Sequence, residues 1–315
     1  MNELGARPVE ARGLVKHYGD IAAVNGVDLT VEAGDVYGYL GPNGAGKTTS
    51  LRMLLGLIRP SGGSARLFGR DPMLDGAKAL QGVAGFVESP RFYPYMSGRK
   101  NLELLAGLDG GGAKGRIDEA LDTVDLSDRA KDRVGGYSHG MRQRLGIAGA
   151  LIRDPRLLLL DEPTTGLDPA GMRDMRTLVR RLADGGMTVL LSSHLMGEVE
   201  ELCDRVAIIR SGQIVFEGAM ADLRSQATDD SAYRLRTSND EWAYTVCLAQ
   251  VGVTQLVAVG GELRFRAPEP VAGRLSVALV EAGLEILALA PQNATLEDLF
   301  FRMTEGDPTP AQVAS

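Results

Sequence analysis

The chain has 315 residues, 44% of them hydrophobic, which is enough for one large domain and a small one. Its 34 basic and 41 acidic residues give a formal net charge of −7, which argues against a general nucleic-acid-binding role, because such proteins are basic. The two cysteines, Cys203 and Cys247, form no metal-binding pattern and suit a reducing cytosol.

Two segments bear on membrane insertion. Residues 1–15 lack the apolar core of a secretory signal. Residues 243–261 contain no charge, so a membrane span is one interpretation. Their glutamines, threonines and glycines favour the other interpretation, a buried helix followed by a turn and a strand. We therefore expect a soluble protein, which another component would have to hold at a membrane.

The N-terminal region is predicted to form an antiparallel layer. Residues 9–15 and 27–31 alternate or run apolar, as strands do, and residues 16–20 lie between them. Tyr18, an aromatic before a loop, can stack on a nucleotide base or simply pack, and the residue alone does not decide between the two.

The strongest motif follows. Residues 41–48 fit G-x-x-x-x-G-K-[ST], a phosphate-binding loop. The apolar residues 36–40 before it predict a buried strand, and apolar residues recur at helical spacing from Leu51 to Ile58 after it. This strand–loop–helix context disfavours the alternative, a glycine-rich turn with a chance Lys-Thr.

The loop has a defined chemistry. Its glycines are expected to let the backbone wrap around a phosphate chain at the positive end of the helix dipole. Lys47 would reach the β- and γ-phosphates, and the Thr48 hydroxyl would bind Mg²⁺. The expected nucleotide contacts here are Gly41, Asn43, Gly44, Gly46, Lys47, Thr48 and Thr49.

Short strands are predicted at residues 62–68 and 82–87, before an aromatic loop over residues 88–96. Its prolines exclude a helix. Phe92, Tyr93 and Tyr95 are either an exposed docking site or a small satellite core, and both remain open at this point.

Two helices are predicted at residues 101–107 and 117–124, separated by glycines 110–112. Residues 137–144 then place a Ser-x-Gly turn at the start of another helix, which is an anion site by geometry.

Buried strands end in polar residues at two more points. Leucines 157–160 precede Asp161 and Glu162, which suit Mg²⁺ binding and the polarising of a water. A helix cap would explain one carboxylate, not both. A turn at 166–169 and a charged helix to about residue 183 come next. The buried strand predicted at residues 188–191 then precedes His194. Ligands bind outside the carboxyl ends of strands in open α/β sheets, so we expect these groups to converge.

The C-terminal part changes character. After a hairpin over residues 206–217, residues 220–230 predict a helix that runs into a polar linker. Residues 233–290 predict the order β-α-β-β-α-β, a ferredoxin-like module. Residues 295–303 predict a closing helix, capped by Thr295 with Asp298 at its third position.

Together these residues resemble the ATP-binding subunit of ABC transporters over about residues 5–220. The resemblance implies an α/β fold, a P-loop NTPase of ABC type with a mixed sheet and a helical subdomain, followed by the small α+β module. The expected domains are 1–222 for ATP binding, 223–305 for the accessory module and 306–315 for a flexible tail.

The resemblance also assigns roles. Residues 41–49 resemble Walker A and residues 157–163 resemble Walker B. Two copies would pair head to tail as a homodimer around two ATP molecules, without nucleic acid. The implied roles are Tyr18 stacking on adenine, Asp161 on Mg²⁺, Glu162 as catalytic base, His194 as switch histidine, Asp168 in the D-loop, and Ser138 and Gly140 on the γ-phosphate held by the partner.

Two residues depart from the family pattern. His139 replaces a glycine of the signature motif, which is expected to hinder backbone approach. Glu88 replaces the Q-loop glutamine and is a candidate Mg²⁺ ligand, although it can also simply hydrogen-bond its loop. A carboxylate there is similar to bacitracin- and lantibiotic-immunity-type export ATPases, whose subunits serve a separate membrane permease at the cytoplasmic face.

Two other functions would use the same nucleotide-binding domain. A soluble ABC-type ATPase of translation or DNA repair would be expected to have two fused cassettes or a long coiled-coil insertion, and neither is present. A nucleotide-sensing regulator would be expected to have lost Glu162 or His194, and both are present.

Overall fold

The computed structural model describes residues 6–108, 112–228, 232–292 and 295–305. The chain divides into two compact units, residues 1–219 and 220–315. Each is considered by itself. The tail expected at 306–315, and most of the glycine run expected between two helices, lie outside the described residues.

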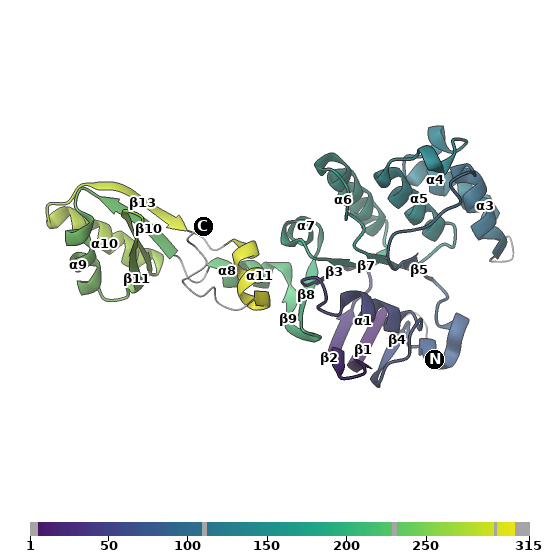
Figure 1. Cartoon of the computed structure of the whole chain (residues 1–315), viewed down its shortest axis with the longest axis horizontal. Coiled ribbons are helices and arrows are strands. Elements are labelled where there is room, and N and C mark those ends of the chain that lie inside the picture. Colours follow the sequence, from purple (N-terminus) through teal and green to yellow (C-terminus); the bar gives the residue numbers. More distant parts are fainter. Residues whose placement is uncertain (1–5, 109–111, 229–231, 293–294, 306–315) are drawn as a thin grey trace. The chain divides into compact units, whose positions relative to one another are not determined.

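The first unit is built on a six-stranded sheet of order β5-β6-β7-β3-β8-β9 (Figure 1). Every neighbouring pair is parallel except β8 and β9, which form the predicted hairpin. Strands β3, β6 and β7 are buried along their whole length, which explains their continuous apolar sequences. The bounds are β3 Val36–Leu40, β5 Val83–Phe86, β6 Leu157–Asp161, β7 Thr188–Ser193, β8 Arg205–Arg210 and β9 Gln213–Ala219.

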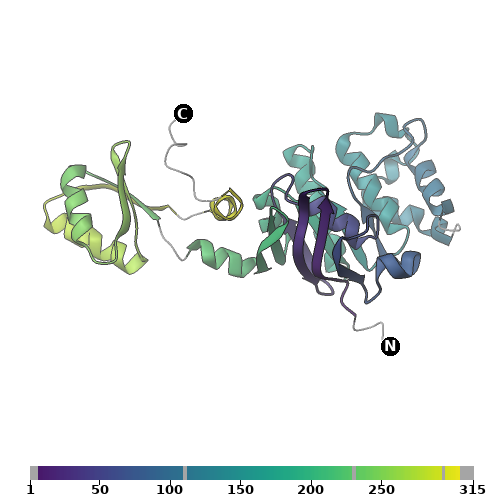
Figure 2. The same ribbon diagram turned by 60° about the horizontal axis from the view of Figure 1, so that its bottom comes forward.

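A second, antiparallel sheet has the order β2-β1-β4, with bounds Val9–Tyr18, Ile21–Val31 and Gly62–Leu67 for β1, β2 and β4 (Figure 2). Both strands are longer than predicted. Lys16 pairs with Val24 and Tyr18 with Ile21, and the chain turns at Gly19–Asp20, directly after Tyr18. The strand ends are half-buried or exposed, so their side chains lack the apolar alternation that sequence reasoning follows.

Helices complete the first unit. Helix α1 packs against strands of both sheets, and α3, α4 and α5 pack on one another beside β5 (Figure 1). Helix α7 was not predicted, because its N-cap, Leu195, offers no capping side chain that would mark where the helix begins. The bounds are α1 Lys47–Leu54, α2 Pro72–Asp75, α3 Gly98–Leu108, α4 Ile117–Thr123, α5 His139–Leu151, α6 Pro169–Asp184 and α7 Met196–Leu202.

The second unit contains the predicted β-α-β-β-α-β order. Its antiparallel sheet has the order β11-β12-β10-β13. The uncharged residues 243–261 fall into α9, a turn and β11, the expected order of elements, with Cys247 buried in the core. The expected burial is wrong for the strand, because five of the six residues of β11 are exposed. The bounds are β10 Ala232–Thr237, α9 Asp240–Ala249, β11 Thr254–Val259, β12 Glu262–Arg266, α10 Glu269–Glu281 and β13 Ile286–Gln292.

Two further helices belong to this unit. Helix α8 (Met220–Thr228) contacts α11 (Leu296–Glu305). The predicted cap of α11 is confirmed, since the Asp298 amide donates to Thr295 Oγ1 at 3.1 Å and the Thr295 amide donates to Asp298 Oδ2 at 2.9 Å. Among the described residues, no helix has the length and apolar character needed to cross a membrane.

Candidate active site

The phosphate loop joins β3 to α1, as the sequence predicts. Gly44 and Gly46 have φ of +80° and +108°, a region that favours glycine. A Cβ on Gly41 would lie 2.4 Å from the Ile209 carbonyl oxygen, and one on Gly46 would lie 2.4 Å from that of Ala23. The protein's own backbone therefore comes too close for a side chain at Gly41 and Gly46. Their wrapping around a phosphate chain stays a prediction.

Lys47 begins α1 and is already held inside the loop. Its side chain is 5% exposed, and Nζ donates to the carbonyl oxygens of Gly41 at 2.7 Å and Pro42 at 3.2 Å. Nζ also lies 3.2 Å from Glu162 Oε1. The first amides of a helix have no partner within it, so the loop offers a buried cation and free donors to an anion.

Asp161 at the end of β6 fits a magnesium ion. The carboxylate is buried, and its Oδ1 accepts the hydroxyl of Ser192 from the neighbouring strand β7. Among the described residues nothing donates to Oδ2. No cluster of three or more His, Cys, Asp or Glu residues forms a metal site in the part of the chain that the structure describes. One carboxylate and the Thr48 hydroxyl suit Mg²⁺, which keeps waters and takes other ligands from phosphates.

Glu162 occupies a constrained position after β6. Its φ is +48°, and its amide donates to Ser192 Oγ at 3.0 Å. Its Oε2 accepts from Thr165 Oγ1 at 2.9 Å. Burial raises the pKa of Glu162, but the Thr165 hydroxyl and the Lys47 charge outweigh it, so the pKa lies below the ordinary value. The carboxylate is therefore ionised at neutral pH and can accept a proton.

His194 follows β7 and reaches the same carboxylate. Its Nδ1 lies 2.9 Å from Glu162 Oε2. A carboxylate only accepts hydrogen bonds, so Nδ1 carries the proton and Nε2 faces away from this contact. The structure brings Lys47, Asp161, Glu162 and His194 together, as the convergence of strand ends predicts.

Sequence reasoning missed Glu198 on α7. The side chain is 7% exposed, and its Oε2 accepts from Thr164 Oγ1 at 2.6 Å and from Ser193 Oγ at 3.0 Å. Glu198 thus ties the loop that carries Glu162 to the loop that carries His194. The available signal was a glutamate one helical turn after His194.

Glu88 and Tyr18 lie outside this cluster of contacts. Glu88 has a φ of +70° and forms an ion pair with Arg52 of α1. Its role toward the metal stays a prediction. Tyr18 is 48% exposed, and Lys16 Nζ lies 5.1 Å from its ring centroid. The ring is accessible for stacking, as are the exposed Asn43 and the half-buried Thr49 for phosphate contacts.

The signature residues open α5. Ser138 Oγ accepts from the Met141 amide at 3.2 Å, so the serine caps the helix. A Cβ on Gly140 would lie 3.6 Å from Leu167, which places the signature beside the D-loop. Asp168 caps α6 through the Gly171 amide at 2.9 Å. Their predicted contacts belong to a second copy and stay predictions.

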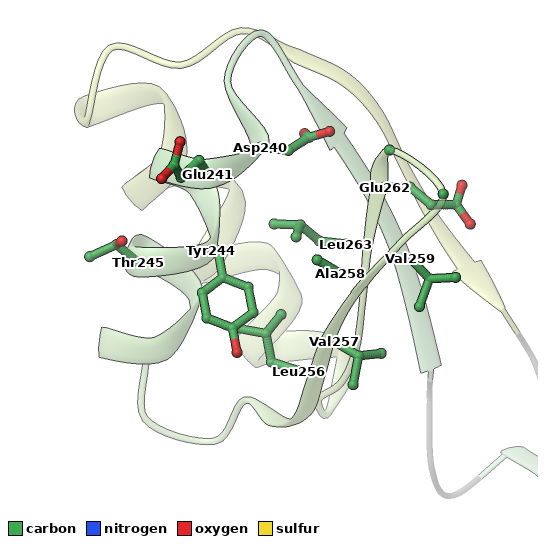
Figure 3. A pocket seen from close by; sticks show the side chains of 12 residues that line it. Asp240, Glu241, Tyr244, Thr245, Leu256, Val257, Ala258, Val259, Glu262 and Leu263 are labelled. Carbon is green, nitrogen blue, oxygen red and sulfur yellow. The ribbon is translucent and has the colours of Figure 1, made fainter. Parts of the chain in front are cut away.

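A separate hollow of about 870 Å³ lies in the second unit between α9 and the β11–β12 hairpin (Figure 3). Tyr244 and Leu256 line it, with carboxylates at its rim. Asp240 already accepts from the Thr237 amide at 2.7 Å, and Glu262 pairs with Arg264 at 2.9 Å. None of the predicted nucleotide-binding residues lines this hollow.

The glycine-rich cradle holds a buried lysine after β3, a buried aspartate ends β6 in the same sheet, and a Glu–His pair lies beside the lysine. These features together define a P-loop ATPase. The ABC transporter family model matches residues 24–165. The bacitracin transport ATP-binding protein BcrA of Bacillus licheniformis is 37% identical, covering 95% of this chain and 97% of that protein. The daunorubicin/doxorubicin resistance ATP-binding protein DrrA of Streptomyces peucetius is also 37% identical, covering 96% and 94%.

Solved structures agree with the fold. An ATP-binding subunit of an ABC transporter is similar with a TM-score of 0.61 and 28% identity, covering 69% of this chain and 92% of that chain. The chain therefore belongs to the ATP-binding proteins of ABC transporters. It is an ATPase subunit, of the kind that works with membrane components.

Proposed function

We propose that this subunit powers the export of an antibiotic, drug or similar amphiphilic cargo through a separate membrane permease, as a homodimer at the cytoplasmic face. The observation that carries the ATPase part is Glu162, which contacts both Lys47 and His194. The chain is similar to a bacitracin transport protein and to daunorubicin resistance proteins over 94–96% of its length. This similarity supports export, because it includes the second unit as well as the ATPase unit.

The proposed chemistry follows from the contacts. The γ-phosphate competes with Glu162 for Lys47, and the carboxylate that is released accepts a proton from the attacking water. His194 holds the carboxylate through Nδ1 and offers Nε2 to the γ-phosphate. Mg²⁺, held by Thr48 and Asp161, would neutralise charge on the phosphates. Ser138 and Gly140 would reach the nucleotide of the second copy.

The proposed permease-docking surface is the aromatic loop before α3. Tyr93 and Tyr95 are 49% and 66% exposed, and their ring centroids are 5.8 Å apart. The loop is fixed, since Asn101 accepts from the Tyr93 amide at 2.8 Å and donates to its carbonyl oxygen at 3.1 Å. Two exposed rings on a fixed loop favour docking over a satellite core.

The test is native copurification from membranes, with Tyr93→Ala/Tyr95→Ala as the variant. We expect the wild type to retain a permease and the variant to lose most of it, while both bind ATP equally. Leu74→Ala is a matched control, because Leu74 is 84% exposed and lies on α2, outside this loop. Recovery of ribosomes or DNA-repair proteins would favour the soluble alternative, and unchanged permease recovery would refute the docking surface.

A further inference from the structure

His139, the signature residue that departs from the family pattern, contacts the loop after Glu162. Its Nε2 lies 3.0 Å from the carbonyl oxygen of Thr165. A carbonyl oxygen only accepts, so Nε2 carries a proton and donates. Gly166 passes close to the ring, since a Cβ there would lie 3.4 Å from Nε2, and its φ is +77°.

Thr165 is held from its other side by the catalytic carboxylate. Its hydroxyl donates to Glu162 Oε2 at 2.9 Å, and its amide donates to the Glu162 carbonyl oxygen at 3.2 Å. Two hydrogen bonds therefore lead from the signature helix to the general base, through the hydroxyl and the carbonyl of one threonine. The pKa of Glu162 depends on the same hydroxyl.

The ring at position 139 has the Thr165 carbonyl oxygen as its acceptor. Gln143, one turn later on α5, is 2% exposed, and its amide nitrogen lies 3.5 Å from His139 Nε2, but an amide N–H does not hydrogen-bond to a nitrogen that itself carries a proton. A glycine at 139 would lack any group that reaches Thr165. The exposed signature residue, Ser138, and the half-buried Gly140 flank the histidine directly.

We propose that His139 is a positioning residue that couples the two ATP sites of the homodimer. This inference rests on the proposed function, in which Ser138 and Gly140 close on the partner's nucleotide while Glu162 acts on the chain's own. Movement of the start of α5 onto the partner's ATP pulls on the Thr165 carbonyl through His139. Thr165 then resets the orientation of Glu162, so occupancy of one site sets the activity of the other.

The test compares His139→Gly with His139→Gln in the full-length protein, using ATPase rate against ATP concentration. Misplacing a catalytic group by a fraction of an ångström to 1 Å costs up to about 100-fold, so we expect His139→Gly to lower kcat about 10-fold and bring the Hill coefficient to about 1. Gln keeps a donor on a side chain of similar reach and is expected to restore most of both values. Binding of a fluorescent ATP analogue to the single subunit should not change.

A double-mutant cycle with Thr165→Val isolates the route, since valine keeps the shape and removes the hydroxyl that holds Glu162. Coupled residues give non-additive effects, so His139→Gly should cost little more once Thr165→Val is present. Additive losses, an unchanged Hill coefficient in His139→Gly, or a wild-type coefficient of 1 would overturn the coupling.

Two controls separate this result from other failures. In a Glu162→Gln background, His139→Gly should still form the ATP-trapped dimer, and loss of that dimer would replace coupling by a simple docking role. A wild-type protein that does not hydrolyse ATP would instead refute the proposed function, whatever His139 does.

Discussion

The two units of this chain bury different kinds of side chain. In the described part of residues 1–219 the buried polar residues include Lys47, Asp161 and Glu198. In the described part of residues 220–315 they are only Thr237 and Thr304. The second unit's core is apolar, with Tyr233 stacked on Phe265 at 5.4 Å. Buried charge is costly unless it is paired, so its location marks where the protein performs chemistry.

Backbone conformation gives the same contrast. In the first unit Glu162, directly after β6, and Glu88, the ion-pair partner of Arg52 in α1, have positive φ. The other non-glycine residues of this kind there are Phe68, Asp125, Asp154 and Ser211. In the second unit only Gln255, on the edge strand β11, is a non-glycine residue of this kind among the described residues. A strained backbone is tolerated where surrounding contacts hold it in place. At Glu162 the contact is the hydrogen bond from the Glu162 amide to Ser192 Oγ.

The largest expected effect lies at the general base. Glu162→Gln should lower steady-state ATP turnover about 10²- to 10⁴-fold, because an amide cannot accept the proton. ATP binding should persist, and the variant should accumulate as a closed dimer by size-exclusion chromatography with ATP. His194→Ala is expected to abolish hydrolysis as well. Turnover close to wild type in Glu162→Gln would remove this residue from the mechanism.

Lys47→Ala should act on binding. A hydrogen bond to a charged group contributes about 1.5–3 kcal/mol, so nucleotide affinity is expected to fall about 10- to 100-fold. Titration with a fluorescent ATP analogue measures this. Lys78→Ala is a suitable control, since Lys78 is exposed and is none of the proposed nucleotide-binding residues. Equal affinity in wild type and Lys47→Ala would contradict the cradle.

Glu198→Ala tests the link between the two catalytic loops. The variant leaves the hydroxyls of Thr164 and Ser193 without their buried acceptor. This loss should lower the free energy of unfolding by about 1–3 kcal/mol. We expect a lower Tm and a reduced kcat with KM little changed. Glu198→Gln is the matched control, because its one carbonyl oxygen can still accept both hydroxyls, while the other position, Oε1, has no partner in the described residues. Equal loss in both variants would show that charge, rather than the two hydrogen bonds, matters.

Removal of the second unit should have the smallest effect on nucleotide binding. A chain ending at Gln226 keeps every proposed nucleotide-binding residue, so its affinity for ATP is expected to stay within about twofold, well under the tenfold that corresponds to about 1.4 kcal/mol. Calorimetric titration against the full chain measures the difference. A folded truncation that does not bind ATP would show that the accessory module completes the site, and the contrast between the units would fail.

Local sequence patterns were enough to predict the strand–loop–helix around Lys47, the buried strands before Glu162 and His194, and the β-α-β-β-α-β order of the second unit. These features depend on local spacing, because apolar periodicity, glycines and capping residues act over a few neighbouring positions. The Thr295–Asp298 cap is of this kind, and the structure confirms it.

Contacts between residues far apart in the sequence could not be predicted in this way. Glu198 joins Thr164, 34 positions earlier in the chain, and His139 joins Thr165, 26 positions later. Gly41 and Gly46 lie against the carbonyl oxygens of Ile209 and Ala23. No pattern in the sequence around these glycines predicts either neighbour. Such contacts depend on how β3, β6 and β7 are ordered in the sheet. Strand order is set by long-range packing, and the sequence of one strand does not show which strands will lie beside it.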